Sequence, residues 1–130
     1  IALRLNPDVS IKTHPYIATG LRENKFGIEL EQLPEATAEL AGQNFVSLVG
    51  VSLHLGSQMM SFESFDHALS RLLPIFEDLQ KKFSTCQVFD IGGGLGVFYE
   101  QQNLEKESQL LKDYAEVVKK HFSQRRIILQ

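Results

Sequence analysis

The stretch Cys86-Gln-Val-Phe-Asp-Ile-Gly-Gly-Gly-Leu-Gly96 decides the fold, because a short apolar, β-rich run there breaks at once into glycines. The run ends at Asp90, and the triple glycine Gly92-Gly-Gly94 follows one residue later. Glycines directly after a strand let the chain turn at positive φ and leave backbone N–H groups uncovered by side chains. Such a turn is suited to binding an anion, most often phosphate. A sharp, closely packed strand-to-helix turn without a ligand needs the same glycines, and both interpretations stay open at this point.

Two nucleotide-binding motifs compete for these glycines. The pattern Asp90-x-Gly92-x-Gly94-x-Gly96 fits the first motif of adenosylmethionine-dependent methyltransferases, whereas the dinucleotide fingerprint fails because Val97 stands where its third glycine should be. A methyltransferase needs an acidic residue at the end of the next strand, roughly 20 residues on, but here that strand follows about 30 residues later and ends in Gln130. It also gives the segment from His54 to Ser57 no role. The methyltransferase stays as an alternative.

The composition indicates one globular domain. The chain has 130 residues, 43% of them hydrophobic, and a net charge of −3. It has neither a basic patch typical of nucleic-acid binding nor an apolar run of the roughly 18 residues that a membrane span requires. The single cysteine excludes an internal disulfide, so we expect a cytoplasmic location. Because the sequence begins with Ile1 and not with Met, we expect a piece of a larger protein.

Periodicity predicts strands that alternate with helices. Alternating or β-rich apolar runs predict four strands, at 1–6, 48–54, 86–90 and 126–130. Apolar residues spaced by three and four predict helices at 29–41, 61–83 and 105–122. The connection at 7–28 is far longer than the usual length of about 4–6 residues, which is typical of a functional loop.

Single residues add expectations about the helices. Gly42 is expected to end the first helix and Ser61 to cap the second. Pro74 should kink or break the second helix, because it removes a backbone hydrogen bond. His67 and His121 fall within helices and are expected at the surface. The histidines show no metal-ligand spacing, so no metal site is predicted.

The order of elements predicts an α/β fold, half of a (β/α)8 TIM-type barrel that spans residues 1–130. Alternating strands and helices form parallel sheets with right-handed crossovers. A sheet with helices on both faces is apolar on both, whereas the inner face of a barrel is allowed to be polar near its active-site end. Polar residues share one face of three strands here: Arg4 with Asn6, Ser52 with His54, and Asp90. About four parallel strands are half of such a barrel.

Three strand ends should meet at one rim of this barrel. His54, Ser57 and the glycine turn are expected at the carboxyl ends of neighbouring strands, where barrel enzymes keep their active sites. A flat, phosphorylated cofactor fits this set, with His54 against its ring and Ser57 on its phosphate. A structural histidine and a turn-capping serine explain the same residues. Arg4 on the inner face needs a partner such as Asp90 or a ligand, because a buried unpaired guanidinium is costly.

Five segments, in order along the chain, resemble diaminopimelate decarboxylase. They are Leu3-Arg-Leu-Asn-Pro7, Thr13-His-Pro-Tyr-Ile-Ala-Thr-Gly20, Glu23-Asn-Lys-Phe-Gly27, His54-Leu-Gly-Ser-Gln58 and Asp90-Ile-Gly-Gly-Gly-Leu-Gly96. That family belongs to the pyridoxal-phosphate enzymes with an alanine-racemase-like barrel. His-x-Gly-Ser and the triple glycine are shared with ornithine and arginine decarboxylases, so the stretch from Thr13 to Gly27 is what points to diaminopimelate. Ornithine, arginine and carboxynorspermidine decarboxylases stay as alternatives.

The resemblance implies a role for several residues toward pyridoxal 5'-phosphate. His54 would stack on the pyridine ring, and Arg4 would lie near the ring hydroxyl or shape that wall. The phosphate would be bound by a hydroxyl and by the glycine amides, the middle one most centrally; these residues are Ser57, Gly92, Gly93 and Gly94. Family members convert meso-2,6-diaminopimelate to L-lysine and carbon dioxide in lysine biosynthesis, and they act as homodimers.

The resemblance also implies that part of the machinery lies outside this chain. The Schiff-base lysine would precede residue 1, and the substrate-binding residues, with a cysteine from the partner subunit, would follow residue 130. No catalytic residue is therefore assigned here, and the piece alone is expected to be inactive and, with two open sheet edges, to self-associate. Gln130 stands where an acid against the pyridine nitrogen is expected. A non-enzymatic alternative is a phosphate or pyridoxal carrier of the same barrel superfamily.

Overall fold

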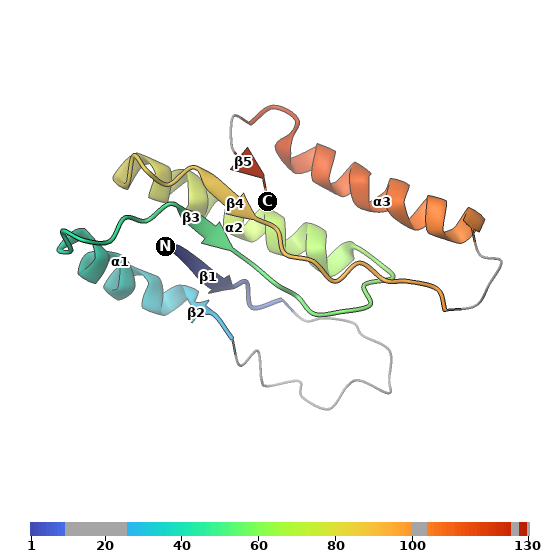
Figure 1. The fold of residues 1–130 in the computed structure, drawn as a ribbon, viewed down its shortest axis with the longest axis horizontal. Coiled ribbons are helices and arrows are strands. Elements are labelled where there is room, and N and C mark those ends of the chain that lie inside the picture. Colours follow the sequence, from blue (N-terminus) through green and yellow to red (C-terminus); the bar gives the residue numbers. More distant parts are fainter. Residues whose placement is uncertain (10–25, 100–103, 126–127, 130) are drawn as a thin grey trace.

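Five short strands form one sheet at the centre of the computed structural model, which describes residues 1–9, 26–99, 104–125 and 128–129. The strands are β1 (Ala2–Asn6), β2 (Ile28–Glu29), β3 (Gly50–Ser52), β4 (Val88–Asp90) and β5 (Ile128–Leu129). Their spatial order is β2-β1-β3-β4-β5, and every pair of neighbours is parallel (Figure 1). The predicted parallel sheet is therefore confirmed.

Helices follow the strands as the sequence predicts. A 3-10 helix, η1 (Leu30–Gln32), leads into α1 (Leu33–Ala41), and the longer helices are α2 (Glu63–Lys82) and α3 (Leu104–Phe122). Gly42 ends α1 as expected, and its N–H donates to the carbonyl oxygen of Glu39 at 3.2 Å. Within the described residues, none of these helices combines the length and the apolar character that crossing a bilayer demands.

The structure corrects the expected cap of α2 and excludes a break at Pro74. The helix begins after Phe62, and no side chain caps its first turn, so Ser61 is not the cap. Pro74 lies inside the helix without breaking it. Leu73 and Phe76, on either side of the proline, are 1% and 0% exposed. Burial of such side chains contributes roughly 2 kcal/mol each, which offsets the cost of about 3 kcal/mol for an internal proline.

Two strands differ from the expected pattern. The two-residue strand β2 is too short to show alternation in the sequence, and it pairs with the end of β1, with Ile28 opposite Leu5. The strand β3 covers only part of the run expected at 48–54. Extended pairing continues past it, because the Leu53 N–H donates to the Asp90 carbonyl oxygen at 2.9 Å. The sheet therefore reaches toward the glycine turn even where regular strand structure has ended.

One face of the sheet packs against the helices. Leu3, Val51 and Phe89 occupy matching register positions on this face and are at most 8% exposed. The Phe89 ring lies 5.1 Å from Phe76 of α2 and 5.6 Å from Phe122 of α3, measured between ring centroids. Figure 1 shows α2 behind the strands, with α1 and α3 to either side. The core is therefore a single layer between the sheet and its helices.

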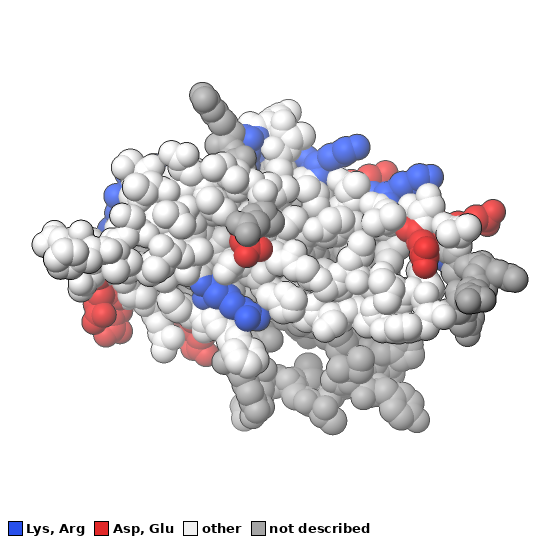
Figure 2. Space-filling model, viewed as in Figure 1, with Lys and Arg blue, Asp and Glu red and all other residues white. Residues whose placement is uncertain are grey.

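The opposite face carries the polar row that the sequence predicts. Arg4, Ser52 and Asp90 occupy matching register positions on β1, β3 and β4, and all three are half-buried. Figure 2 views this face, most of which is uncharged. A parallel sheet with helices on one face and polar side chains on the other matches half of a (β/α)8 barrel, in which the second face is the inner wall.

A polar contact fastens α3 to α2. The Asp66 carboxylate accepts a hydrogen bond from Lys120 Nζ at 2.7 Å, and its other oxygen lies 2.6 Å from His121 Nε2. The Lys120 bond and then the His121 contact lower the pKa of Asp66 from its usual value, against the opposing effect of burial. His121 is 8% exposed, so the expected surface position is wrong for this residue, whereas His67 is exposed as expected.

The single cysteine belongs to the core. Cys86 lies just before β4 and is 1% exposed, and its N–H donates to the Phe83 carbonyl oxygen at 2.9 Å. Burial raises the pKa of its thiol to about 11. Because the thiolate is the reactive form, this thiol is inert at neutral pH in the folded chain.

Candidate functional site

The turn after β4 depends on residues that have no side chain. Gly92 and Gly94 have φ angles of +69° and +100°, in the left-handed region that favours glycine. A Cβ on Gly92 would lie 2.4 Å from the Leu53 carbonyl oxygen, and one on Gly94 would lie 1.8 Å from that of Gly56. The backbone of the glycine turn therefore packs directly against the segment that follows β3.

The middle of the glycine turn is open to a ligand. Asp90 Oδ1 accepts a hydrogen bond from the Gly92 N–H at 2.8 Å, which holds the first amide of the turn. Among the described residues, the amides of Gly93 and Gly94 donate to no acceptor. Gly93 is exposed, and a Cβ on it would meet nothing within 4 Å. Open backbone amides in a glycine turn fit the phosphate of a cofactor.

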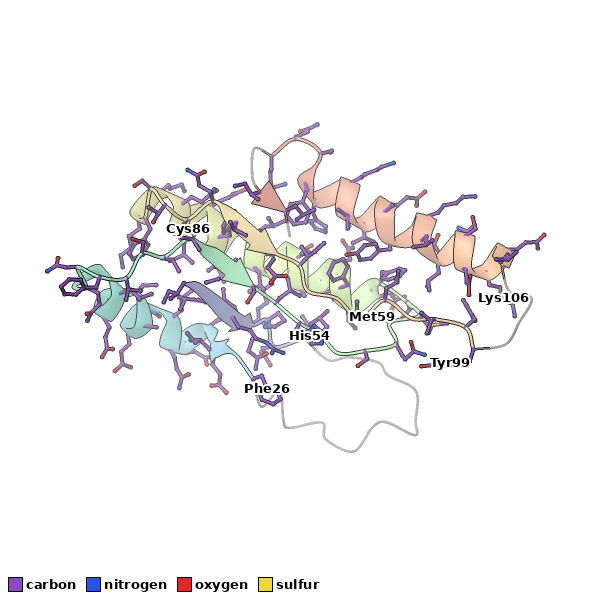
Figure 3. All side chains as sticks on the ribbon, in the orientation of Figure 1. Phe26, His54, Met59, Cys86, Tyr99 and Lys106 are labelled. Carbon is purple, nitrogen blue, oxygen red and sulfur yellow. The ribbon has the colours of Figure 1, made fainter. Side chains whose placement is uncertain are left out.

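His54 stands beside the glycine turn, past the end of β3. Its ring Nδ1 and its Cα each lie 3.3 Å from the position that a Cβ on Gly92 would take. The residue is exposed, and Figure 3 shows it between the strands and the loop that carries Met59. The imidazole is therefore within reach of a group bound at the turn.

Ser57 faces the far end of the same turn. Its Cα lies 3.4 Å from the position that a Cβ on Gly94 would take, and the residue is exposed. The preceding residue, Gly56, has a φ of +127°, which only glycine adopts readily. The structure thus places His54 and Ser57 against the two ends of the glycine turn, where the sequence predicts them. Their roles toward a cofactor stay predictions.

Arg4 lies on the neighbouring strand β1, and it finds partners other than the expected Asp90. Its Nη2 donates a long hydrogen bond of 3.5 Å to the His54 carbonyl oxygen, and its guanidinium carbon lies 5.4 Å from the centroid of the Phe26 ring. A cation–π contact offsets part of the cost of half-burying this charge. The sequence gives no sign that Phe26 would cover Arg4, because the two are far apart in the chain.

Part of the predicted pattern lies outside the described residues, namely the stretch from Thr13 to Gly20 and residue Gln130. The end of the stretch from Glu23 to Gly27 is described. There Gly27 has a φ of +104°, and a Cβ on it would lie 3.1 Å from the Asn6 backbone nitrogen. In the described ranges, no group of three or more His, Cys, Asp or Glu residues is arranged to hold a metal ion.

A comparison with protein families identifies the family of this chain. The family model described as "Pyridoxal-dependent decarboxylase, pyridoxal binding domain" matches residues 1–129. The chain belongs to this family. This match confirms the expected cofactor, pyridoxal 5'-phosphate. Because the match runs through the whole glycine turn, the methyltransferase interpretation of these glycines is left without support.

Relatives of this chain are named diaminopimelate decarboxylase. The chain is 39% identical over 129 residues to that of Pseudomonas aeruginosa, covering 99% of this chain and 30% of the relative. It is 42% identical over 126 residues to that of Archaeoglobus fulgidus, covering 97% and 29%. The crystal structure of diaminopimelate decarboxylase from Helicobacter pylori complexed with L-lysine matches with a TM-score of 0.78 at 32% identity, covering 99% of this chain and 32% of that one.

These similarities confirm the half-barrel fold and the resemblance to diaminopimelate decarboxylases. The chain spans about 30% of the length of the curated relatives that it matches. What the described site offers is one open glycine turn, one hydroxyl and one imidazole at a common rim. The arrangement is suited to holding a flat, phosphorylated ring.

Proposed function

We propose that this chain is the cofactor-binding part of a longer enzyme, which decarboxylates meso-2,6-diaminopimelate to L-lysine and carbon dioxide in lysine biosynthesis. The observation that carries the proposal is the His54 imidazole beside an open glycine turn, in a chain of the pyridoxal-dependent decarboxylase family. The names of the relatives support diaminopimelate as the substrate.

In this proposal the glycine turn holds the phosphate. The amides of Gly93 and Gly94 donate their N–H groups, and the Ser57 hydroxyl donates from the facing loop. Gly92 shapes the turn and does not bind through its amide, because Asp90 already occupies that N–H. Backbone donors in a turn fixed by close packing are oriented before the ligand arrives, which lowers the entropic cost of binding.

His54 and Arg4 fix the position of the ring. The exposed His54 imidazole stacks on one face and keeps water from it, while Arg4 borders the edge that carries the ring hydroxyl. The Phe26 ring and the His54 carbonyl oxygen orient the guanidinium. When bound, pyridoxal phosphate supplies an electron-withdrawing ring that accepts the electron pair left by departing carbon dioxide.

The parts of the enzyme outside this chain supply the lysine that forms a Schiff base with the cofactor and the residues that bind the substrate. The whole enzyme acts as a homodimer. We therefore expect the 130-residue chain alone to release no carbon dioxide. At the sheet edge formed by β5, Ile128 and Leu129 are 58% and 39% exposed, which supports self-association of the isolated chain. A monomer in light scattering at micromolar concentration would contradict that expectation. The buried free thiol of Cys86 supports a cytoplasmic location.

Carbon dioxide release by the full-length protein tests the proposed function. With pyridoxal phosphate present, meso-diaminopimelate should have a higher kcat/KM than ornithine, arginine or carboxynorspermidine. His54→Ala should lower kcat/KM by about 100-fold, because the ring is no longer held in the reactive orientation. His67→Ala, which removes an exposed imidazole from α2, is the matched control and should leave kcat/KM unchanged.

Each other outcome of this assay has a definite meaning. A higher kcat/KM for one of the three other substrates would keep the enzyme class and replace the substrate. Cofactor binding without carbon dioxide release from any of the four would favour the pyridoxal carrier. A full-length protein that binds no pyridoxal phosphate would contradict the proposed site itself.

A further inference from the structure

Gln58 has an unusual backbone conformation for its residue type. It follows Ser57 directly and has a φ of +56°, and within the described ranges Asp8 is the other non-glycine residue with positive φ. A residue with a Cβ is disfavoured in this left-handed region, so surrounding contacts must hold it there. Within the segment His54-Leu-Gly-Ser-Gln58, the resemblance implies roles for His54 and Ser57 but none for Gln58.

The Gln58 side chain binds both backbone groups of one residue on the neighbouring loop. Its Oε1 accepts a hydrogen bond from the Val97 N–H at 2.9 Å, and its Nε2 donates to the Val97 carbonyl oxygen at 3.2 Å. A side-chain amide has the same donor and acceptor as a peptide group, so it pairs with Val97 as another strand would. Gln58 is thereby tied across a sequence separation of 39 residues.

The next residue extends this pairing. The Met59 N–H donates to the Gly94 carbonyl oxygen at 2.8 Å, and the Gly96 N–H donates to the Met59 carbonyl oxygen at 3.0 Å. Together with the Gln58 bonds, these make a short ladder between the loop after β3 and the loop after β4, next to Met59 in Figure 3. We call this set of hydrogen bonds the loop clasp.

The loop clasp lies immediately beyond the phosphate-binding residues of the proposed function. Ser57 precedes Gln58 in one loop, and Gly93 and Gly94 precede Leu95 in the other. A Cβ on Gly94 would already overlap the Gly56 carbonyl oxygen, so the two loops touch at this point. The loop clasp therefore joins the two loops directly beside the Ser57 hydroxyl and the glycine amides.

We propose that Gln58 is a positioning residue that holds Ser57 and the glycine turn at the separation a phosphate group requires. This inference rests on the proposed function for the identity of the ligand. Gln58 itself does not touch the phosphate; it acts through the backbone of Val97 and through the two loops that it joins. Without its amide, the Ser57 hydroxyl and the Gly93 amide no longer converge on one oxyanion.

Binding of two related ligands to the cofactor-free, full-length protein tests the positioning role. Gln58→Ala and Gln58→Gly should each raise the Kd for pyridoxal phosphate by about tenfold, the equivalent of one or two hydrogen bonds. The Kd for pyridoxal, which lacks the phosphate, should stay within about twofold of the unsubstituted protein. Gln109→Ala removes an exposed amide from α3 and is the control for both ligands.

The Gln58→Gly variant distinguishes the loss of the side-chain amide from a requirement for positive φ in the backbone. Gly tolerates positive φ, so if conformational freedom at position 58 were the only requirement, Gln58→Gly would bind pyridoxal phosphate like the unsubstituted protein. That result, or an equal loss of affinity for pyridoxal and pyridoxal phosphate, would overturn the positioning role. A general loss of folding would also affect both ligands equally.

Hydrogen exchange provides a readout that does not depend on the cofactor. In the cofactor-free protein, the amides of Gly96 and Val97 should exchange about tenfold faster in Gln58→Ala and Gln58→Gly than in Gln109→Ala. Unchanged exchange would overturn the clasp, whatever the ligand data show. If the unsubstituted protein binds no pyridoxal phosphate while exchange still responds, the proposed function fails and with it the phosphate-positioning role.

Discussion

The helix-packed face of the sheet and the rim at its strand ends are held together in different ways. On the helix face, Phe89 contacts aromatic rings from two helices, and its register neighbours Leu3 and Val51 are also buried. At the rim, close backbone packing at the glycines and single hydrogen bonds, such as that from Gly92 to Asp90, define the geometry. Hydrophobic burial is non-directional, whereas a hydrogen bond is lost by a small displacement. Stability and ligand binding should therefore respond to different substitutions.

The largest effect should come from the centre of the helix-packed face. Phe89→Ala should lower the free energy of unfolding by about 3–5 kcal/mol, because it leaves a cavity between Phe76 and Phe122. Phe45→Ala is the control, since that ring is 99% exposed, and it should change stability by less than about 0.5 kcal/mol. Urea unfolding followed by circular dichroism measures both. Equal effects of the two substitutions would show that the core does not centre on Phe89.

The next effect should separate two adjacent glycines of the rim. Gly94→Ala should cost about 2–3 kcal/mol, because its φ is +100° and its Cβ would overlap the Gly56 carbonyl oxygen. Gly93→Ala places its Cβ in open space, so it should lower the free energy of unfolding by less than about 0.5 kcal/mol. It should still weaken pyridoxal phosphate binding. Unfolding and cofactor titration should be run on both. If Gly93→Ala were as destabilising as Gly94→Ala, the conclusion that the middle of the turn is open would be wrong.

A smaller effect should appear in the polar contact between α2 and α3, as a dependence on pH. Asp66 has a lowered pKa in the folded protein, mainly through its bond to Lys120. Its contribution is therefore fully present above the pKa of the unfolded chain, about 3.9, and is lost as the pH falls through the lower folded value. Because the Lys120 side chain is 60% exposed and screened by solvent, Asp66→Asn should cost only about 1 kcal/mol at neutral pH.

Unfolding of Asp66→Asn at neutral pH and in acid measures this contribution. The difference from the unsubstituted protein should shrink below pH about 3.9, where the carboxylate takes up a proton. Asp78→Asn is the control, because both side chains of the Asp78–Lys81 pair are 76% exposed and such pairs contribute little. A difference that stays constant with pH would indicate that packing of the side chain, and not its charge, stabilises the contact.

The smallest effect on stability should accompany a clear effect on binding. Ser57→Ala removes an exposed hydroxyl and should leave the free energy of unfolding within about 0.5 kcal/mol, yet raise the Kd for pyridoxal phosphate about tenfold. Ser61→Ala, four residues later and also exposed, should change neither quantity. If the serine variants bound the cofactor equally well, Ser57 would have no part in the phosphate site.

The helix-packed face could be predicted from the sequence because its signal is periodic. The apolar positions of α2 recur every three or four residues, and Phe65, Leu69 and Phe76 are all buried as this spacing requires. Periodicity failed where it was short or where tertiary contacts prevailed. Alternation places Val49 on the same strand face as the buried Val51, yet Val49 is 40% exposed. His121 is buried because Asp66 supplies a partner from another helix.

The rim could be predicted only in part. Strand direction and the glycines were enough to bring His54, Ser57 and the turn together, since parallel strands end at the same edge. The contacts that refine the site join residues far apart in the chain, as Arg4 with Phe26 or Gln58 with Val97 do. No local pattern encodes such pairs. The left-handed conformation of Gln58 is likewise invisible in a residue type that rarely adopts it.

The buried Cys86 thiol can be used to measure transient opening of the core. Cys86 is the single cysteine of the chain, it lies where the sheet meets its helices, and its pKa of about 11 keeps it protonated at neutral pH. A thiol reagent should therefore label it only during excursions that separate these two layers. The labelling rate then reports how often such openings occur, and a lower rate with the cofactor bound would show that the ligand at the rim also stabilises the interior.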